Sequence, residues 1–487
     1  MMTLLKTARP EARKRRGPIS GAVRGWLIAA ALSLTAPAAM SETLADALAA
    51  AYNTSGLLEQ NRALLRAADE DVAAAVTLLR PIISWSTDVT RNYSRVRGGT
   101  GLDAFNNGSS DTTSLTAAIT AEWLIYDFGR SSLRAASAKE LVLATRQSLV
   151  GIEQDVLFRA VQAYMNVVRN TRFVALRRNN VRVIGESLRA AQDRFEVGEV
   201  TRTDVAQAEA RLSQARSNLA TARGDLKRAI EEYVAVTGRQ PGNLTTSPRV
   251  PTLTRSEDTA KVVALRNHPD MLAAQYNVAA AKLNVLVAEA AMKPSVSLGA
   301  SVGVSERLDG STETDSNSLS IGVSGPIYQG GALSSNKRSA YAQRDAQLGV
   351  LHQTRDRIRQ NVGIAYAVLE AARASAVASI EQVRAGRVAF EGVNEEANLG
   401  ARTTLDVLDA EQEYLDAQAN QISAEADVII AAYAVLESTG ELTVRDLNLA
   451  VQTYDPSAYY NLVKDAPAAL SERGKSLDRV LRKIGNQ

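Results

Sequence analysis

Two nine-residue segments match each other across the chain, Val197-Gly-Glu-Val-Thr-Arg-Thr-Asp-Val205 and Leu399-Gly-Ala-Arg-Thr-Thr-Leu-Asp-Val407, at an offset of 202 residues. The same offset relates Ile125-Tyr-Asp-Phe-Gly129 to Ile327-Tyr-Gln-Gly-Gly331. A match that recurs at one fixed offset indicates a duplicated structural unit. We therefore expect two repeats, each with a helix, two strands and long helices, at residues 42–240 and 256–440. A linker at residues 241–255 joins them, and a tail follows at residues 441–487.

Each repeat contains two segments in which apolar and polar residues alternate. They are residues 83–93, 114–125, 295–304 and 318–327. Alternation with period two over about ten residues predicts β-strands. The polar faces are rich in Ser, Gly and Thr, as the wall of a watery lumen would be, and about 9–11 residues is the length of a tilted membrane strand. The alternation alone would also fit a half-buried soluble sheet.

Four strands are too few for a membrane barrel, because the smallest known barrels need about eight. Open sheet edges are not tolerated in lipid. If the strands span a membrane, several chains must share one barrel, and three chains would supply twelve strands. Aromatic residues near the strand ends are the expected membrane-interface residues: Trp85, Tyr93, Trp123, Tyr126 and Tyr328.

The remaining chain has the pattern of long helices. Residues 131–196 and 333–398 are rich in Ala, Leu, Arg, Gln and Glu, and each would reach about 100 Å as one helix. No proline interrupts residues 82–240 or 327–455. Gly198 and Gly400 end these helices, and new ones run to about residues 236 and 436. Shorter helices are expected at 43–79 and 256–292. The fold class is therefore mainly α with a shared β-barrel.

Residues 1–41 have the features of a secretory signal peptide, a basic region before a nine-residue apolar run at 26–34. Its removal takes away seven basic residues and one acidic residue, which leaves 49 basic against 52 acidic residues and a net charge of −3. A nucleic-acid partner is therefore not expected. No later segment has 18 consecutive apolar residues, so no transmembrane helix is expected either.

The composition also argues against disulfides, metal sites and catalysis in this chain. Cysteine is absent and there are only two histidines, His268 and His352, so disulfides, lipoprotein anchoring and a metal site are not expected. The sequence contains no phosphate loop, HExxH or GxSxG motif. We expect no enzyme activity and no cofactor.

Taken together, the signal peptide, the tandem repeat, the paired strands and the proline-free helices resemble the TolC family of outer-membrane efflux proteins. The most specific segments are residues 398–410 and their partner at 197–209, and residues 442–456 look like the tail of the branch that serves type I secretion. The resemblance implies a homotrimer with a twelve-stranded barrel in the outer membrane and a helical tunnel in the periplasm. The linker and tail would form an equatorial belt. A periplasmic adaptor and an inner-membrane ABC or proton-driven transporter would be the partners.

The resemblance also assigns a periplasmic gate. Asp406 and Asp409 stand three residues apart on one helix face, so three chains would bring six carboxylates around a constriction. The alternative is that acids in a first helical turn only complement the helix dipole. Arg402, Thr203 and Asp204 match the links that hold the entrance closed in the family.

Two positions at this gate depart from the expected pattern. Ala397 stands where the type member of the family has a gate tyrosine, and Gln207 is the first-repeat counterpart of Asp409. The latch is therefore expected to be weaker or built differently.

The turns at the helix tips are expected to dock the adaptor. Their residues are Val197, Gly198, Leu399 and Gly400.

The function that follows from the resemblance is a passive trimeric exit duct, driven by a partner transporter. A soluble periplasmic coiled-coil scaffold or adaptor is the alternative, although an adaptor should carry β-rich domains beside a single helical hairpin. Drug efflux and type I protein secretion both stay open as the cargo, and the tail favours secretion.

Overall fold

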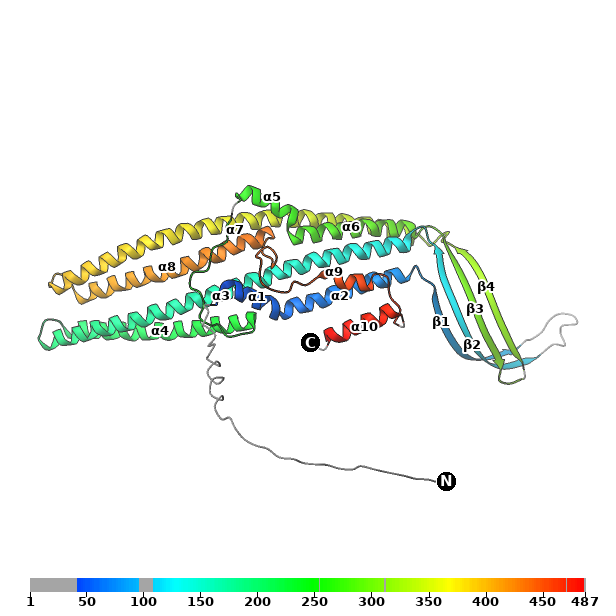
Figure 1. The fold of residues 1–487 in the computed structure, drawn as a ribbon, viewed down its shortest axis with the longest axis horizontal. Helices are drawn as coiled ribbons and strands as arrows, with labels where there is room; N and C mark the ends of the chain where they lie inside the picture. Colours follow the sequence, from blue (N-terminus) through cyan, green and yellow to red (C-terminus); the bar gives the residue numbers. More distant parts are fainter. Residues whose placement is uncertain (1–41, 96–107, 254, 311, 470, 486–487) are drawn as a thin grey trace, which may run out of the picture. The chain divides into compact units, whose positions relative to one another are not determined.

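The computed structural model describes residues 42–95, 108–253, 255–310, 312–469 and 471–485. The predicted signal peptide lies outside these residues. The first half contains α1 (Leu44–Thr54), α2 (Gly56–Thr77), β1 (Ile82–Arg95), β2 (Ser109–Tyr126), α3 (Arg130–Glu196) and α4 (Arg202–Thr237). The second half contains α5 (Glu257–Asn267), α6 (Pro269–Ala290), β3 (Ser295–Arg307), β4 (Glu313–Ser324), α7 (Ala332–Asn398) and α8 (Thr404–Thr439). Both halves have the same order of elements, which confirms the duplication (Figure 1).

The four strands form one antiparallel sheet in the order β1-β2-β3-β4 (Figure 1). Trp85 lies opposite Ile119, which in turn lies opposite Val302, so the apolar positions of neighbouring strands share one face. Hydroxyl groups meet on the other face, where Ser84 Oγ lies 2.8 Å from Thr120 Oγ1. The register therefore keeps the two faces separate, as the alternation predicts.

The apolar face of this sheet is uncovered in the single chain. The exposed fraction is 78% for Trp85, 77% for Leu319 and 72% for Ile83. Trp123 is also exposed, and its Nε1 donates to the carbonyl oxygen of Leu79 at 3.3 Å, at the end of β2 that leads into the helices. A soluble monomer rarely exposes so large an apolar surface.

The end of β4 differs from the sequence expectation. The strand was expected to reach Ile327, but it ends at Ser324, just before Gly325 and Pro326. Proline has no N–H to donate to a sheet, which explains the early end. Tyr328 therefore lies beyond the strand, where it is 84% exposed.

Two expected helices are each divided in two. The helix expected at 43–79 breaks at Ser55, whose side chain accepts a hydrogen bond from the Leu58 N–H and so begins α2. The helix expected at 256–292 breaks at His268, whose Nδ1 accepts from the Asp270 N–H at 3.1 Å ahead of α6. Pro269 follows at the first helical position, where proline is favoured.

The long helices match their expected lengths. α3 and α7 have 67 residues each, or about 100 Å. α3 packs against α4 and α7 against α8, and α3 also contacts α6 and α8. Two shorter helices follow, α9 (Pro456–Val463) and α10 (Glu472–Gly485).

One helix among the described residues is long and apolar enough to cross a membrane by length and composition alone. Within the described residues, the stretch Ala332–Ala397 contains an 18-residue window with a mean hydropathy of 1.2, of which 17% is buried. The helix has no run of 18 consecutive apolar residues, because alanine and valine here alternate with a few charged residues. Ile364, Val368 and Val377 are exposed along this helix.

The largest core forms where α3 passes α1, α2 and the last turns of α4 and α8. Leu157 and Tyr164 of α3 are fully buried there. Glu42 pairs with Leu244 in a parallel bridge, and its carboxylate accepts from Tyr233 Oη at 2.6 Å and from Arg239 Nη2 at 2.7 Å. The first described residue thus holds the 241–255 linker against the core.

Candidate functional site

The turns that join the long helices, α3 to α4 and α7 to α8, have the same geometry. Gly198 and Gly400 have φ of +82° and +79°, a left-handed conformation that strains residues with a side chain. After the first glycine the Glu199 N–H donates to the Arg194 carbonyl at 2.9 Å, and after the second the Ala401 N–H donates to the Glu396 carbonyl at 2.9 Å. Both expected tip glycines therefore end a helix, in the manner of a Schellman motif.

A capping box starts each returning helix. The carboxylate of Asp406 accepts from the Thr403 N–H at 2.9 Å and from the Thr403 hydroxyl at 2.8 Å. The Asp406 N–H donates back to Thr403 Oγ1 at 3.2 Å. Thr201 and Asp204 form the same box 202 residues earlier. Asp204 and Asp406 therefore stabilise the starts of α4 and α8. The T-x-x-D spacing could have identified this role from the sequence.

These capping bonds keep both acids ionised. The Thr403 N–H and then its hydroxyl lower the pKa of Asp406 below its ordinary value. The Thr201 hydroxyl and then its N–H do the same for the pKa of Asp204. Because hydrogen bonds to the charged form favour that form, both carboxylates carry a negative charge at neutral pH.

Asp409, the second expected gate acid, is bound differently. Its Oδ1 accepts from Arg211 Nη2 of α4 at 2.6 Å, so the pair joins the first helical hairpin to the second. The sequence alone does not predict Arg211 as the partner of Asp409, because spacing along one helix does not show which residues of another helix it meets. Asp406 and Asp409 thus have unequal surroundings, one in a helix cap and one in an ion pair.

Arg402 lies in the second turn but bonds within its own hairpin. Its Nε donates to Glu396 Oε2 at 2.8 Å. Within the described chain, no hydrogen bond or ion pair joins Arg402 to Thr203 or Asp204. The structure of one chain therefore does not form the predicted link between these residues.

A row of polar contacts between α3 and α8 was also missed. Arg169 Nη2 donates to Asp427 Oδ1 at 2.5 Å, and Arg172 pairs with Glu425. Nearer the tips, Asn180 Nδ2 donates to Glu411 Oε1 at 3.1 Å. We call these contacts, together with the Arg211–Asp409 pair, the inter-hairpin seam.

Glu411 is the unusual member of the inter-hairpin seam. It is 6% exposed, and its second carboxylate oxygen has no hydrogen-bond partner. Burial raises its pKa to about 7, and the hydrogen bond from Asn180 opposes this only in part. Glu411 is therefore partly protonated near neutral pH, unlike Asp406.

The tips themselves are apolar and exposed. Val197 is 71% and Leu399 is 85% exposed, each directly before a turn glycine. Ala397 is half-buried in the last turn of α7, and the Gly400 N–H donates to its carbonyl oxygen at 3.1 Å. Among the described residues, no group of three or more His, Asp or Glu side chains is arranged to hold a metal ion.

Comparison with known proteins agrees with this architecture. The family described as "Outer membrane efflux protein" matches residues 47–239 and 262–441. The outer membrane efflux protein BepC of Brucella suis is 38% identical over 434 residues, which cover 89% of this chain and 92% of that protein. Protein CyaE of Bordetella pertussis is 29% identical over 409 residues, 82% of this chain and 84% of that protein.

Solved structures show the same fold. The Campylobacter jejuni CmeC outer membrane channel superposes with a TM-score of 0.73 at 16% identity, covering 86% of this chain and 89% of that chain. The resemblance that the repeats, strands and helix tips indicate is thereby confirmed.

Proposed function

The chain belongs to the outer membrane efflux protein family, and from this premise we propose that it is a trimeric exit duct with a gate at its helix tips. It is an outer-membrane channel protein that extends into the periplasm. The soluble scaffold alternative is not supported, since the family match covers both repeats. The proposed cargo is that of type I protein secretion, of drug efflux or of both.

The four-stranded sheet is the observation that supports a trimer. Within the described residues, β1 and β4 each pair along one edge only, and the apolar face between them is exposed. Lipid would leave the unpaired edges without hydrogen-bond partners, at several kcal/mol for each group. Joining β4 of one chain to β1 of the next satisfies both edges, and three chains close twelve strands. Twelve is an even number within the range of known membrane barrels.

The tips support a partner-dependent gate. Exposed Val197 and Leu399 offer an adaptor an apolar contact at the end of each hairpin. Ionised Asp406 supplies one negative charge per chain beside the Arg211–Asp409 pair. We propose that these acids surround the entrance and favour cations there. The energy for transport comes from an inner-membrane transporter, and the chain itself acts as a conduit and not as an enzyme.

Because the chain has no cysteine, introduced thiols can test the barrel. Ser86→Cys on β1 and Ser318→Cys on β4 lie on the same polar face. Within one chain they are separated by three strand spacings, about 14 Å, and by a further two residues along the strands. A bismaleimide with a reach of about 8 Å can span neighbouring strands but not three strand spacings. It should therefore react between chains and give a covalent trimer on a denaturing gel.

Either single variant alone cannot close the ring and serves as the control. A double variant that stays monomeric after full reaction with the reagent would contradict the shared barrel. The polar-face positions leave the lipid-facing surface unchanged, so insertion into the membrane is not disturbed.

A further inference from the structure

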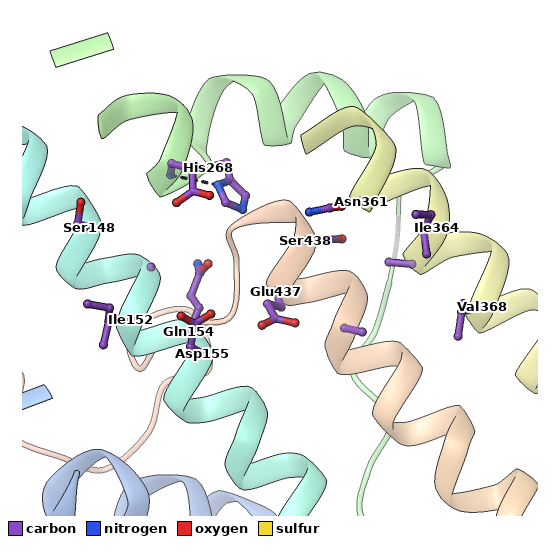
Figure 2. A pocket seen from close by; sticks show the side chains of 14 residues that line it. Ser148, Ile152, Gln154, Asp155, His268, Asn361, Ile364, Val368, Glu437 and Ser438 are labelled. Carbon is purple, nitrogen blue, oxygen red and sulfur yellow. Dashed lines mark hydrogen bonds between the residues drawn. The ribbon is translucent and has the colours of Figure 1, made fainter. Parts of the chain in front are cut away.

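A cavity of about 610 Å³ lies far from the helix tips, where four helices meet. α3 and α7 pass beside it, α6 begins there at His268 and α8 ends there just after Glu437 (Figure 2). Its volume falls within the range of small-molecule sites, about 300–1,000 Å³. None of the gate residues lines it.

Two carboxylates line this cavity without a positive partner. The structure shows no hydrogen bond or ion pair to the side chain of Asp155 on α3 or Glu437 on α8, both of which are described residues (Figure 2). The third acid, Asp270, is different because Arg357 Nη2 donates to its Oδ2 at 2.9 Å. The cavity therefore carries uncompensated negative charge on the side of Asp155 and Glu437.

Gln154 provides a second and independent sign of a ligand. Its side chain reaches into the cavity from α3 and is only 2% exposed (Figure 2). The Nε2 group of this amide has no hydrogen-bond acceptor. A buried donor without an acceptor is unfavourable and uncommon in native proteins. A molecule that binds here should offer it an oxygen.

The remaining lining residues limit the kind of ligand that fits the cavity. Ile364 and Val368 of α7 and Ile152 of α3 give the cavity an apolar wall (Figure 2). A bare metal ion would use neither this wall nor the Gln154 donor. A matching ligand has a positive group, an acceptor oxygen near it and a carbon skeleton.

We propose that this cavity binds a small organic amine. Its ammonium group lies beside Asp155 and Glu437, its acceptor oxygen faces Gln154 Nε2, and its carbon skeleton packs on Ile364 and Val368. This inference goes beyond the channel role, because it assigns a ligand site that can be measured as binding without any transport.

The titration of Glu437 is consistent with such a ligand. Burial first, and then the charge of Asp155, raise the pKa of Glu437 to about 7. An ammonium group favours the ionised carboxylate, so binding should tighten as pH rises from about 6 to 8. His268 faces the same space, and burial lowers its pKa below the ordinary value. Asp270, which also lines the cavity, is paired with Arg357.

The test uses the full chain in lipid nanodiscs and dansylcadaverine as the probe, which combines an ammonium group, sulfonyl oxygens and an apolar ring. Fluorescence anisotropy gives its Kd. Glu437→Gln should weaken binding by about tenfold or more, since it removes a hydrogen bond to a charged group. Gln154→Leu, which keeps the volume but loses the donor, should weaken it by about fivefold.

Glu413→Gln is the matched control, because Glu413 is exposed on the same helix α8 and loses the same charge. It should leave the Kd unchanged, and the N-acetylated probe should bind poorly to every variant. Wild-type affinity in Glu437→Gln would overturn the proposal. Equal weakening in Glu413→Gln, or equal binding of the acetylated probe, would overturn it too. Far-UV circular dichroism establishes that each variant is folded.

Discussion

Glu411→Gln should stabilise the inter-hairpin seam, and the gain should depend on pH. The ionised form of Glu411 is penalised in the folded protein, since its pKa rises from an ordinary 4.5 to about 7. That difference corresponds to about 3 kcal/mol. Glutamine has nearly the same shape, keeps an acceptor for Asn180 Nδ2, and carries no charge at any pH.

The sign of the effect follows from the direction of the shift. An acid with a raised folded-state pKa does not lower stability below its ordinary pKa, where it is protonated in both the folded and the unfolded state. Its cost grows as pH rises from about 4.5 to 7 and is then constant. The variant should therefore match the wild type at pH 4.5 and exceed it by about 3 kcal/mol at pH 8. The neighbouring charges of Asp409 and Arg211 are paired with each other and are unchanged by the substitution.

Hydrogen–deuterium exchange measures this locally. Peptides within residues 404–420 of α8 should exchange up to about 100-fold more slowly in Glu411→Gln than in the wild type at pH 8, which is the ratio that about 3 kcal/mol implies. At pH 4.5 the two proteins should exchange alike. Glu413→Gln, two residues away and exposed, is the control. Equal exchange of wild type and Glu411→Gln at pH 8 would refute the reasoning, as would the same slowing in the control.

Three further predictions concern the gate and the core. Asp406→Ala with Asp409→Ala should lower cation selectivity and weaken block by multivalent cations in bilayer recordings, and unchanged values would remove both residues from the gate. Gly400→Ala should cost about 1 kcal/mol in thermal unfolding, because φ is +79° there; an unchanged Tm would contradict the strain. Glu42→Gln should cost about 1–3 kcal/mol, since it weakens a charge-assisted bond to Arg239 and disturbs the one from Tyr233. Limited proteolysis of the 241–255 linker should then speed up, and equal cleavage would show that the linker is held by other contacts.

Much of the fold could be predicted because it depends on periodicity. Alternation places Trp85 and Ile119 on one face, and their pairing in the sheet confirms it. The 202-residue offset predicts equal helical hairpins, which α3–α4 and α7–α8 provide. The break at Ser55 was missed although Ser55 caps a helix, since a continuous apolar pattern outweighed a local signal.

The site could be predicted only in part. Gly198, Gly400 and the acids of the first turns follow from local sequence rules for helix ends. The partners of Asp409 and Glu411 do not, because they depend on how one helix is rotated against another. Arg211 and Asn180 come from the other hairpin, about 200 residues away along the chain. Only packing of the complete hairpins brings those side chains together.

The central claim is that three chains form one cation-selective duct through the outer membrane. The most direct measurement is the conductance of the purified mature protein in a planar bilayer, with chemical cross-linking of the same sample. The account predicts small cation-selective conductance steps and a cross-linked trimer. A protein that stays soluble and never inserts would contradict it, and the four strands would then form an ordinary sheet.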